Sequence, residues 1–146
     1  MQQPIVISGA GILGCYISCA LSLQGIDSIV LEKKDDEVED SVRTITLNPF
    51  SKNLLDKIGI ENDYSMINKM EVKDFDGTGK IVFKSSEIGM DHLAYVSDFA
   101  TLLMAVRKKA SEKILYKEEI IDIDNKGDLN EVTLSSGKVI KTNLII

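Results

Sequence analysis

The chain has 146 residues, of which 44% are hydrophobic and 27% are charged, and its formal net charge is −6. This is about one domain in length, and the composition favours a packed core over a disordered chain. Because 23 acidic residues outnumber 17 basic ones, we expect no nucleic-acid partner, which would require clustered positive charge. No hydrophobic run approaches the ~20 residues that span a bilayer, and the N-terminus lacks the features of a secretory signal.

Cysteine and histidine are too scarce to predict a metal site. Cys15, Cys19 and His92 are the complete set, and the spacing of the cysteines fits neither a zinc site nor a disulfide. We therefore expect no metal, reduced thiols and a cytoplasmic location. Cys15 lies near a predicted helix start, where a thiol pKa can fall, but packing is its preferred role. A surface or hydrogen-bonded role is expected for His92.

The N-terminal part of the chain predicts a strand, a helix and a second strand. Residues 4–8 form a short β-branched run, which is typical of a strand buried on both faces. An apolar helix is expected at residues 15–24, where Gly25 ends it. A second buried strand is expected at residues 28–31 and closes with Glu32. A βαβ unit of this kind is right-handed, and its two strands are parallel.

The rest of the chain predicts a mixture of helices and antiparallel strands. Asn48 can cap a helix, Pro49 suits its first position and Gly59 suits its end. Alternating apolar residues separated by turn residues predict a hairpin and a meander. In chain order we expect a charged loop at 33–40, a helix at 48–59, a hairpin at 69–84, a connector at 91–95, a helix from Ser97 or Asp98 to about Lys109, and meander strands at 114–116, 119–124, 131–134 and 139–146.

A G-x-G-x-x-G motif lies between the first strand and the helix. Gly9 permits the tight turn, Gly11 allows a pyrophosphate to approach the backbone, and Gly14 allows the helix to pack closely on the sheet. The free N–H groups and the dipole at the helix start attract phosphate. Glu32 lies 23 residues after Gly9, where it can accept hydrogen bonds from a ribose diol. Its negative charge also argues against NADP, which carries a 2′-phosphate.

Two alternatives remain open for this motif. The first is a glycine turn within a βαβ unit that binds no ligand. The second concerns the cofactor, because the motif alone does not distinguish NAD from FAD. A charged loop, a helix, a hairpin and a meander follow where an NAD domain would continue into another crossover helix and a third parallel strand. This order favours a flavoprotein.

Three segments of the chain resemble the aromatic-ring flavin monooxygenases. The segment IVISGAGILGCYISCALSLQGIDSIVLEK is similar to the start of that family. The segment SVRTITLNPFSKNLLDKIGI resembles the ubiquinone-biosynthesis hydroxylases, such as 2-octaprenyl-6-methoxyphenol hydroxylase. The ending EVTLSSGKVIKTNLII is similar to the family's V-x-L-x-D-G-x-x-x-x-A-x-L-L-V run. The resemblance covers nearly the whole chain and is stronger up to Gly59.

The resemblance implies where a cofactor would bind. The glycine turn corresponds to the pyrophosphate site, and Glu32 to the ribose acid. Arg43 corresponds to the arginine that reaches the pyrophosphate side of the flavin cofactor, and its alternative role is pairing with Asp40 or Glu39. Ile120 falls where the family's backbone passes the adenine. The expected cofactor-binding residues are Gly9, Ala10, Gly11, Ile12, Leu13, Gly14, Glu32, Lys33, Arg43 and Ile120.

The chain also departs from the family in two places. After Tyr95 and Val96 the family has E-N-R, with the arginine near the flavin, whereas residues 97–100 here are SDFA. The next arginine, Arg107, is expected to lie too far along the helix to replace it. The chain ends at Ile146, before the family's G-A-D-G segment and its later G-D motif. An apolar strand at this end indicates the front part of a longer protein.

These features together predict an α/β fold: a truncated, Rossmann-like FAD-binding βαβ unit with an inserted hairpin and an antiparallel β meander. Residues 1–146 would form part of an FAD/NAD(P)-binding domain. The resemblance implies an FAD-dependent monooxygenase that uses NADH or NADPH and oxygen to hydroxylate a polyprenylphenol ring in ubiquinone biosynthesis. It also implies peripheral association with the inner membrane.

No catalytic residue can be named from the sequence. We expect this chain alone to be inactive, with the C-terminal remainder of the enzyme on a separate chain. The alternatives are an NAD-binding dehydrogenase domain and a non-catalytic remnant of a disrupted hydroxylase gene.

Overall fold

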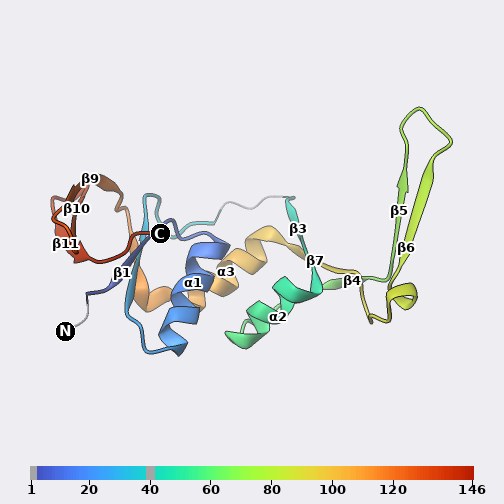
Figure 1. Ribbon diagram of the computed structural model, residues 1–146, viewed down its shortest axis with the longest axis horizontal. Coiled ribbons are helices and arrows are strands. Elements are labelled where there is room, and N and C mark those ends of the chain that lie inside the picture. Colours follow the sequence, from blue (N-terminus) through green and yellow to red (C-terminus); the bar gives the residue numbers. More distant parts are fainter. Residues whose placement is uncertain (1–2, 39–41) are drawn as a thin grey trace. The chain divides into compact units, whose positions relative to one another are not determined.

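The computed structural model describes residues 3–38 and 42–146, and the chain has an α/β fold (Figure 1). It divides into two units. The first consists of Met1–Asp40 and Leu102–Ile146, and the second consists of Ser41–Thr101. The second unit is therefore inserted between the two parts of the first.

The first unit is built around a parallel sheet with the strand order β1-β2-β8. Strands β1 (Ile5–Ser8) and β2 (Ser28–Glu32) pair in parallel, as the sequence predicts. Helix α1 (Ile12–Leu23) connects them and begins three residues earlier than expected, because the helix starts directly after the glycine turn. Strand β8 (Ile114–Tyr116) also pairs in parallel with β2. Its expected place in the antiparallel meander is therefore wrong.

The antiparallel meander consists of β9 (Ile120–Asn125), β10 (Asn130–Leu134) and β11 (Val139–Thr142), with β10 in the middle. Its two turns contain Gly127 and Gly137, whose φ angles of +85° and +83° favour glycine. Strand β11 ends earlier than expected. Beyond it, residues 144–146 run parallel to β1: Val6 and Ile145 form a bridge, and the Ser8 N–H donates to the Ile146 carbonyl oxygen at 2.7 Å.

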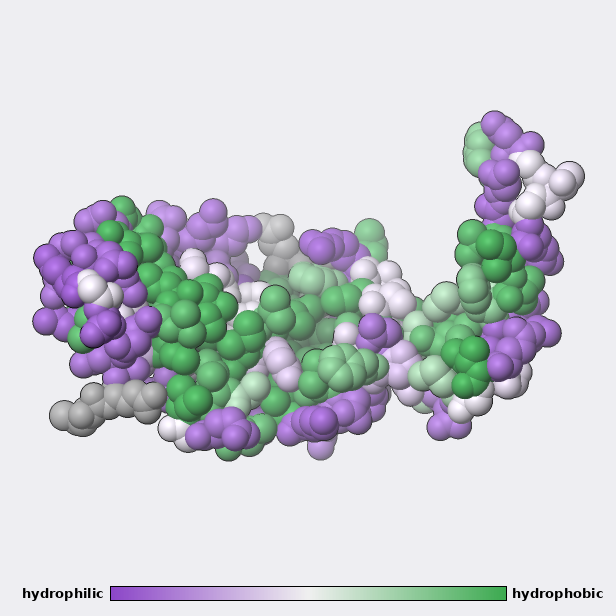
Figure 2. All heavy atoms as spheres, viewed as in Figure 1, coloured by the Kyte–Doolittle hydropathy of each residue, from purple (hydrophilic) through white to green (hydrophobic). Residues whose placement is uncertain are grey.

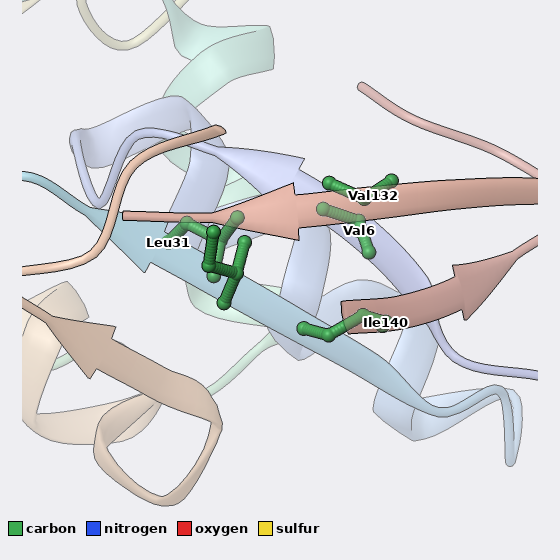
Figure 3. Close-up of a cluster of buried hydrophobic side chains, with 5 residues drawn as sticks. Val6, Leu31, Val132 and Ile140 are labelled. Carbon is green, nitrogen blue, oxygen red and sulfur yellow. The ribbon is translucent and has the colours of Figure 1, made fainter. Parts of the chain in front are cut away.

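The meander covers one face of the parallel sheet. Side chains from both layers form a buried cluster between them (Figure 3), and its members are Val6, Leu31, Val132, Leu134 and Ile140. Helix α1 covers the opposite face, where the hydroxyl oxygens of Ser18 and Ser28 lie 2.8 Å apart in a buried hydrogen bond. Because successive strand residues alternate between faces, a sheet covered on both sides has the continuous apolar strands seen here.

The second unit contains a three-stranded antiparallel sheet in the order β3-β7-β4. Its strands are β3 (Thr44–Leu47), β4 (Ser65–Ile67) and β7 (Ala94–Asp98). The sequence missed β3 and β4, and the connector expected at 91–95 is wrong at its end because Ala94 and Tyr95 belong to β7. A short strand paired only with distant residues carries little local signal.

Capping residues define the helices next to this sheet. Helix α2 (Pro49–Lys57) starts as predicted, with the Ser51 backbone N–H donating to Asn48 Oδ1 at 2.7 Å. Helix α3 (Phe99–Lys109) starts after Asp98, whose Oδ1 accepts from the Thr101 backbone N–H at 2.7 Å. Residues of α3 from Leu102 onward belong to the first unit. Single-turn 3₁₀ helices occupy Ser85–Ile88 and Ser111–Lys113.

The predicted hairpin is present as β5 (Lys69–Lys73) and β6 (Lys80–Lys84). Its register gives it two different faces. One face pairs Met70 with Phe83 and Val72 with Ile81, and the other carries Glu71 between lysines. Hydrophobic and hydrophilic atoms both reach the surface along this hairpin (Figure 2). Within the residues that the structure describes, no helix has the length and apolar character needed to cross a membrane.

Candidate functional site

The glycine turn is fixed to the end of β2. Gly9 has a φ angle of +109°, a conformation that side chains rarely permit, and its N–H donates to the Leu31 carbonyl oxygen at 2.7 Å. The next N–H, that of Ala10, donates to Glu32 Oε2 at 3.1 Å. The predicted turn and the predicted ribose acid are therefore in direct contact.

Gly14 is required by packing within the protein. A Cβ atom added to Gly14 would overlap the carbonyl oxygen of Gly9, so any side chain there would separate the start of α1 from the turn. This confirms the close helix packing expected for the third glycine of the motif.

Gly11 is not required by packing. A Cβ atom added there meets no atom within 4 Å, and the φ angle of −74° is open to any residue. Among the described residues, no side chain caps the start of α1 at Gly11, and its first turn carries no acidic residue. The backbone N–H groups at a helix start without such a cap can receive a phosphate. The residues therefore fit a pyrophosphate group.

Glu32 is held by three donors. Besides the Ala10 N–H, the Lys34 N–H donates to Oε1 at 3.1 Å, and Arg107 donates to Oε2 from a terminal guanidinium nitrogen at 3.4 Å. The Glu32 and Arg107 side chains are only 13% and 11% exposed. The guanidinium also donates from Nε to the Ala10 carbonyl oxygen at 2.8 Å.

Sequence reasoning missed the part played by Arg107. The sequence correctly placed this arginine far along α3. Side chains of a helix lean toward its N-terminus, however, and a long arginine side chain reaches back over a full turn. The signal available in the sequence was an arginine at the apolar face of a helix that leads into a strand of the same sheet. The contact itself joins residues 75 positions apart.

The other predicted cofactor residues lie in different settings. Ile12 and Leu13 form the first turn of α1, and Lys33 is exposed beside Glu32. Ile120 begins β9 and packs against the buried cluster of the first unit. The Glu118 N–H, close to it in sequence, donates to the Glu32 carbonyl oxygen at 3.0 Å, so this segment passes beside the acid.

Arg43 belongs to the second unit. Its guanidinium carbon lies 4.2 Å from the centre of the Phe99 ring, and its carbonyl oxygen accepts from the Phe99 N–H at 2.9 Å. Its alternative partners, Glu39 and Asp40, lie outside the described residues. The role of Arg43 at a cofactor therefore stays a prediction.

The remaining candidate residues are explained by local contacts. Cys15 and Cys19 are buried free thiols, and burial raises the pKa of Cys15 to about 11, which supports a packing role. His92 lies with Nδ1 2.6 Å from Asn68 Oδ1 and packs edge-on against Tyr95, in agreement with the expected hydrogen-bonded role.

Comparison with protein families gives a match to the FAD-binding domain family over residues 2–131. The chain belongs to this family. Its βαβ unit, glycine turn and Glu32 are thus parts of an FAD-binding domain.

Individual relatives are distant and longer. The FAD-binding domain is 25% identical to the zebrafish (Danio rerio) mitochondrial ubiquinone biosynthesis monooxygenase COQ6, over 97% of this chain and 35% of that protein. The chain therefore spans about a third of the length of this curated relative.

Solved structures share the fold at low sequence identity. The Pseudomonas aeruginosa protein PqsL, in complex with 2-aminobenzoylacetate, matches with a TM-score of 0.83 and 19% identity over 99% of this chain and 42% of that one. The p-nitrophenol 4-monooxygenase PnpA of Pseudomonas putida matches with a TM-score of 0.78 and 16% identity, over 99% of this chain and 40% of that one.

The two glycines predict opposite effects of substitution. We expect Gly11→Val to lower the free energy of unfolding by about 1 kcal/mol or less, because the added atoms enter open space. It should weaken ADP binding by more than tenfold, because they occupy the pyrophosphate position. Urea denaturation and calorimetry measure the two effects.

Gly14→Ala is the matched control for this substitution. It should lower the free energy of unfolding by about 1–3 kcal/mol, because the turn or helix must move. Tight ADP binding by Gly11→Val, with the fold intact, would show that the phosphate binds elsewhere.

Burial of Cys15 predicts a loss of stability at alkaline pH. The raised pKa of about 11 means that the folded state holds the thiol proton more tightly than the unfolded chain, whose pKa is near 9.0. The stabilisation is complete below pH 9 and is lost as the pH rises toward 11. A shift of this size corresponds to about 2–3 kcal/mol.

The comparison with Cys15→Ala isolates this contribution from other alkaline titrations. The difference in free energy of unfolding between the parent and the variant should decrease between pH 8.5 and pH 11. A difference that stays constant over this range would contradict the burial of the thiol.

Proposed function

We propose that this chain is the ADP-binding front part of an FAD-dependent monooxygenase that hydroxylates a phenolic ring in ubiquinone biosynthesis. The observation that carries the proposal is the contact between the Ala10 N–H and the Glu32 carboxylate, beside an uncapped helix start. This contact supports the proposal, because the ADP half of FAD requires a ribose acceptor next to a phosphate-binding turn.

Different residues of the first unit would bind the pyrophosphate, the ribose and the adenine of the cofactor. The N–H groups at the start of α1 would hold the pyrophosphate, and Gly11 would let it approach closely. Glu32 would accept hydrogen bonds from the ribose diol, with Lys33 at its side, and the backbone at Ile120 would pass the adenine. The family resemblance assigns Arg43 to the pyrophosphate side of the flavin cofactor.

The flavin would supply the redox chemistry when bound, with NADH or NADPH as reductant and oxygen as co-substrate. The family match supports FAD over the NAD-binding alternative. The name of the zebrafish relative supports a role in ubiquinone biosynthesis, and p-nitrophenol oxidation by a similar fold supports a phenolic substrate. A polyprenylphenol substrate would bring the complete enzyme to the inner-membrane surface.

The ribose role of Glu32 is tested by its substitution. We expect Glu32→Gln to weaken binding of ADP and FAD by about ten- to a hundredfold, because a hydrogen bond to a charged group contributes about 1.5–3 kcal/mol. Calorimetric titration of the 146-residue chain measures this change. NADP⁺ should bind the parent at least about tenfold more weakly than ADP, since its 2′-phosphate meets the carboxylate.

The control is Glu37→Gln, which removes the same charge from an exposed position in the segment that follows β2. Its affinities should equal those of the parent. If Glu32→Gln and Glu37→Gln bind ADP equally well, Glu32 is not the ribose acid. Failure of the parent to bind either ADP or FAD would favour the non-catalytic remnant.

The assignment of these residues to the ADP half of FAD predicts that the chain alone has no hydroxylase activity. The residues assigned above reach only the ADP half of FAD, so the chain alone should give no substrate-dependent oxygen uptake with FAD, NADH or NADPH, and a polyprenylphenol. The assay follows oxygen consumption and hydroxylated product together. Product formation would contradict the assignment and place the complete reaction within these 146 residues.

A further inference from the structure

Arg107 connects two parts of the candidate site that are remote in sequence. From one guanidinium, Nε donates to the Ala10 carbonyl oxygen at 2.8 Å, and a terminal nitrogen donates to Glu32 Oε2 at 3.4 Å. Ala10 is also a donor, since its N–H reaches the same Oε2 atom at 3.1 Å. Turn, acid and arginine therefore form a closed set of contacts.

The contacts are shielded from water. The side chains of Arg107 and Glu32 are 11% and 13% exposed, so their attraction is screened less than that of a surface pair. The Arg107 guanidinium carbon also lies 5.8 Å from the centre of the Tyr116 ring, and Tyr116 is paired with Glu32 across β8 and β2. This aromatic ring supports the arginine from the sheet.

We propose that Arg107 is a positioning residue, which holds the Glu32 carboxylate in the orientation that selects a ribose with both hydroxyl groups. The inference rests on the proposed ADP site. Two of the donors to Glu32 meet at Oε2, one from the turn and one from Arg107, and together they fix the plane of the carboxylate. Within residues 3–38 and 42–146, the Lys34 N–H is the one donor to Oε1. This oxygen therefore keeps a lone pair that can accept a hydrogen bond from a ribose hydroxyl.

An arginine suits this role better than a lysine would. Its planar fork donates in two directions at once, whereas a lysine ammonium is a single point of charge on a flexible stem. Arg107→Lys should therefore keep the charge but lose part of the orientation, and Arg107→Met should lose both. A residue with only a packing role would show no such dependence on the ribose hydroxyls.

The test measures the ratio of affinities for ADP and 2′,3′-dideoxy-ADP, which differ only in the ribose diol. The parent chain should prefer ADP by about tenfold or more, the size expected for hydrogen bonds to a charged group. In Arg107→Met this preference should fall to about threefold or less, with Arg107→Lys in between. Lys108→Met is the control, because Lys108 is an exposed cation in the same helical turn.

A second measurement examines the free protein. Hydrogen exchange at the Ala10 amide, followed by NMR, should be about tenfold faster or more in Arg107→Met, because Glu32 is no longer held against the turn. Lys108→Met should leave the rate unchanged. If Arg107→Met does not fold, Arg107→Lys replaces it in both comparisons.

The outcomes distinguish the positioning role of Arg107 from the proposed ADP-binding function. A reduced ADP preference in Arg107→Met alone supports the inference. An unchanged preference overturns it and leaves the proposed function standing. If the parent does not bind ADP, the proposed function fails, and an Ala10 exchange rate that Arg107→Met does not alter would overturn the positioning role as well.

Discussion

The close approach of α1 to the end of β1 is the constraint on which the rest of the site depends. It exists because Gly14 has no side chain to collide with the carbonyl oxygen of Gly9. With the helix start held there, the Gly9 N–H reaches Leu31 and the Ala10 N–H reaches Glu32. The absence of a side chain at Gly14 thus keeps the start of α1 close to the Glu32 carboxylate.

The sheet beneath this site is stabilised from both sides. Alternation along β2 sends Ser28 toward α1 and Leu31 toward the meander, so each residue type matches the layer it meets. The Ser18 and Ser28 hydroxyls satisfy each other, which removes the cost of burying them beneath the helix. The site is therefore carried on a support that is packed on both faces, and its turn is anchored rather than loose.

Features with local signals were predictable from the sequence. The βαβ unit, the Asn48 and Asp98 caps, the hairpin and the meander each follow from residues that lie close together along the chain. The glycine turn and Glu32 belong to the same class, because the motif spans a single supersecondary unit.

Features that depend on distant pairing were not predictable. Strand β3 pairs with β7, some fifty residues later, and β8 joins β2 across the entire second unit. Nothing in the sequence of Ile114–Tyr116 distinguishes a parallel partner from an antiparallel one. The contact of Arg107 with the turn has the same origin, since it requires both the sheet membership of β8 and the direction in which α3 returns.

The interrupted path of the first unit has a consequence for how the chain folds. Residues 41–101 form contacts among themselves, whereas β2 must find β8 after more than eighty intervening residues. Contacts between remote segments slow folding, although closing a longer loop changes stability only slightly, by about 0.6 kcal/mol for each doubling of its length. During synthesis, the apolar strands β1 and β2 emerge first and wait with open edges for partners near the other end of the chain. The inserted second unit therefore delays the assembly of the nucleotide site more than it destabilises the fold. Until β8 has paired with β2, the open strand edges expose the chain to aggregation.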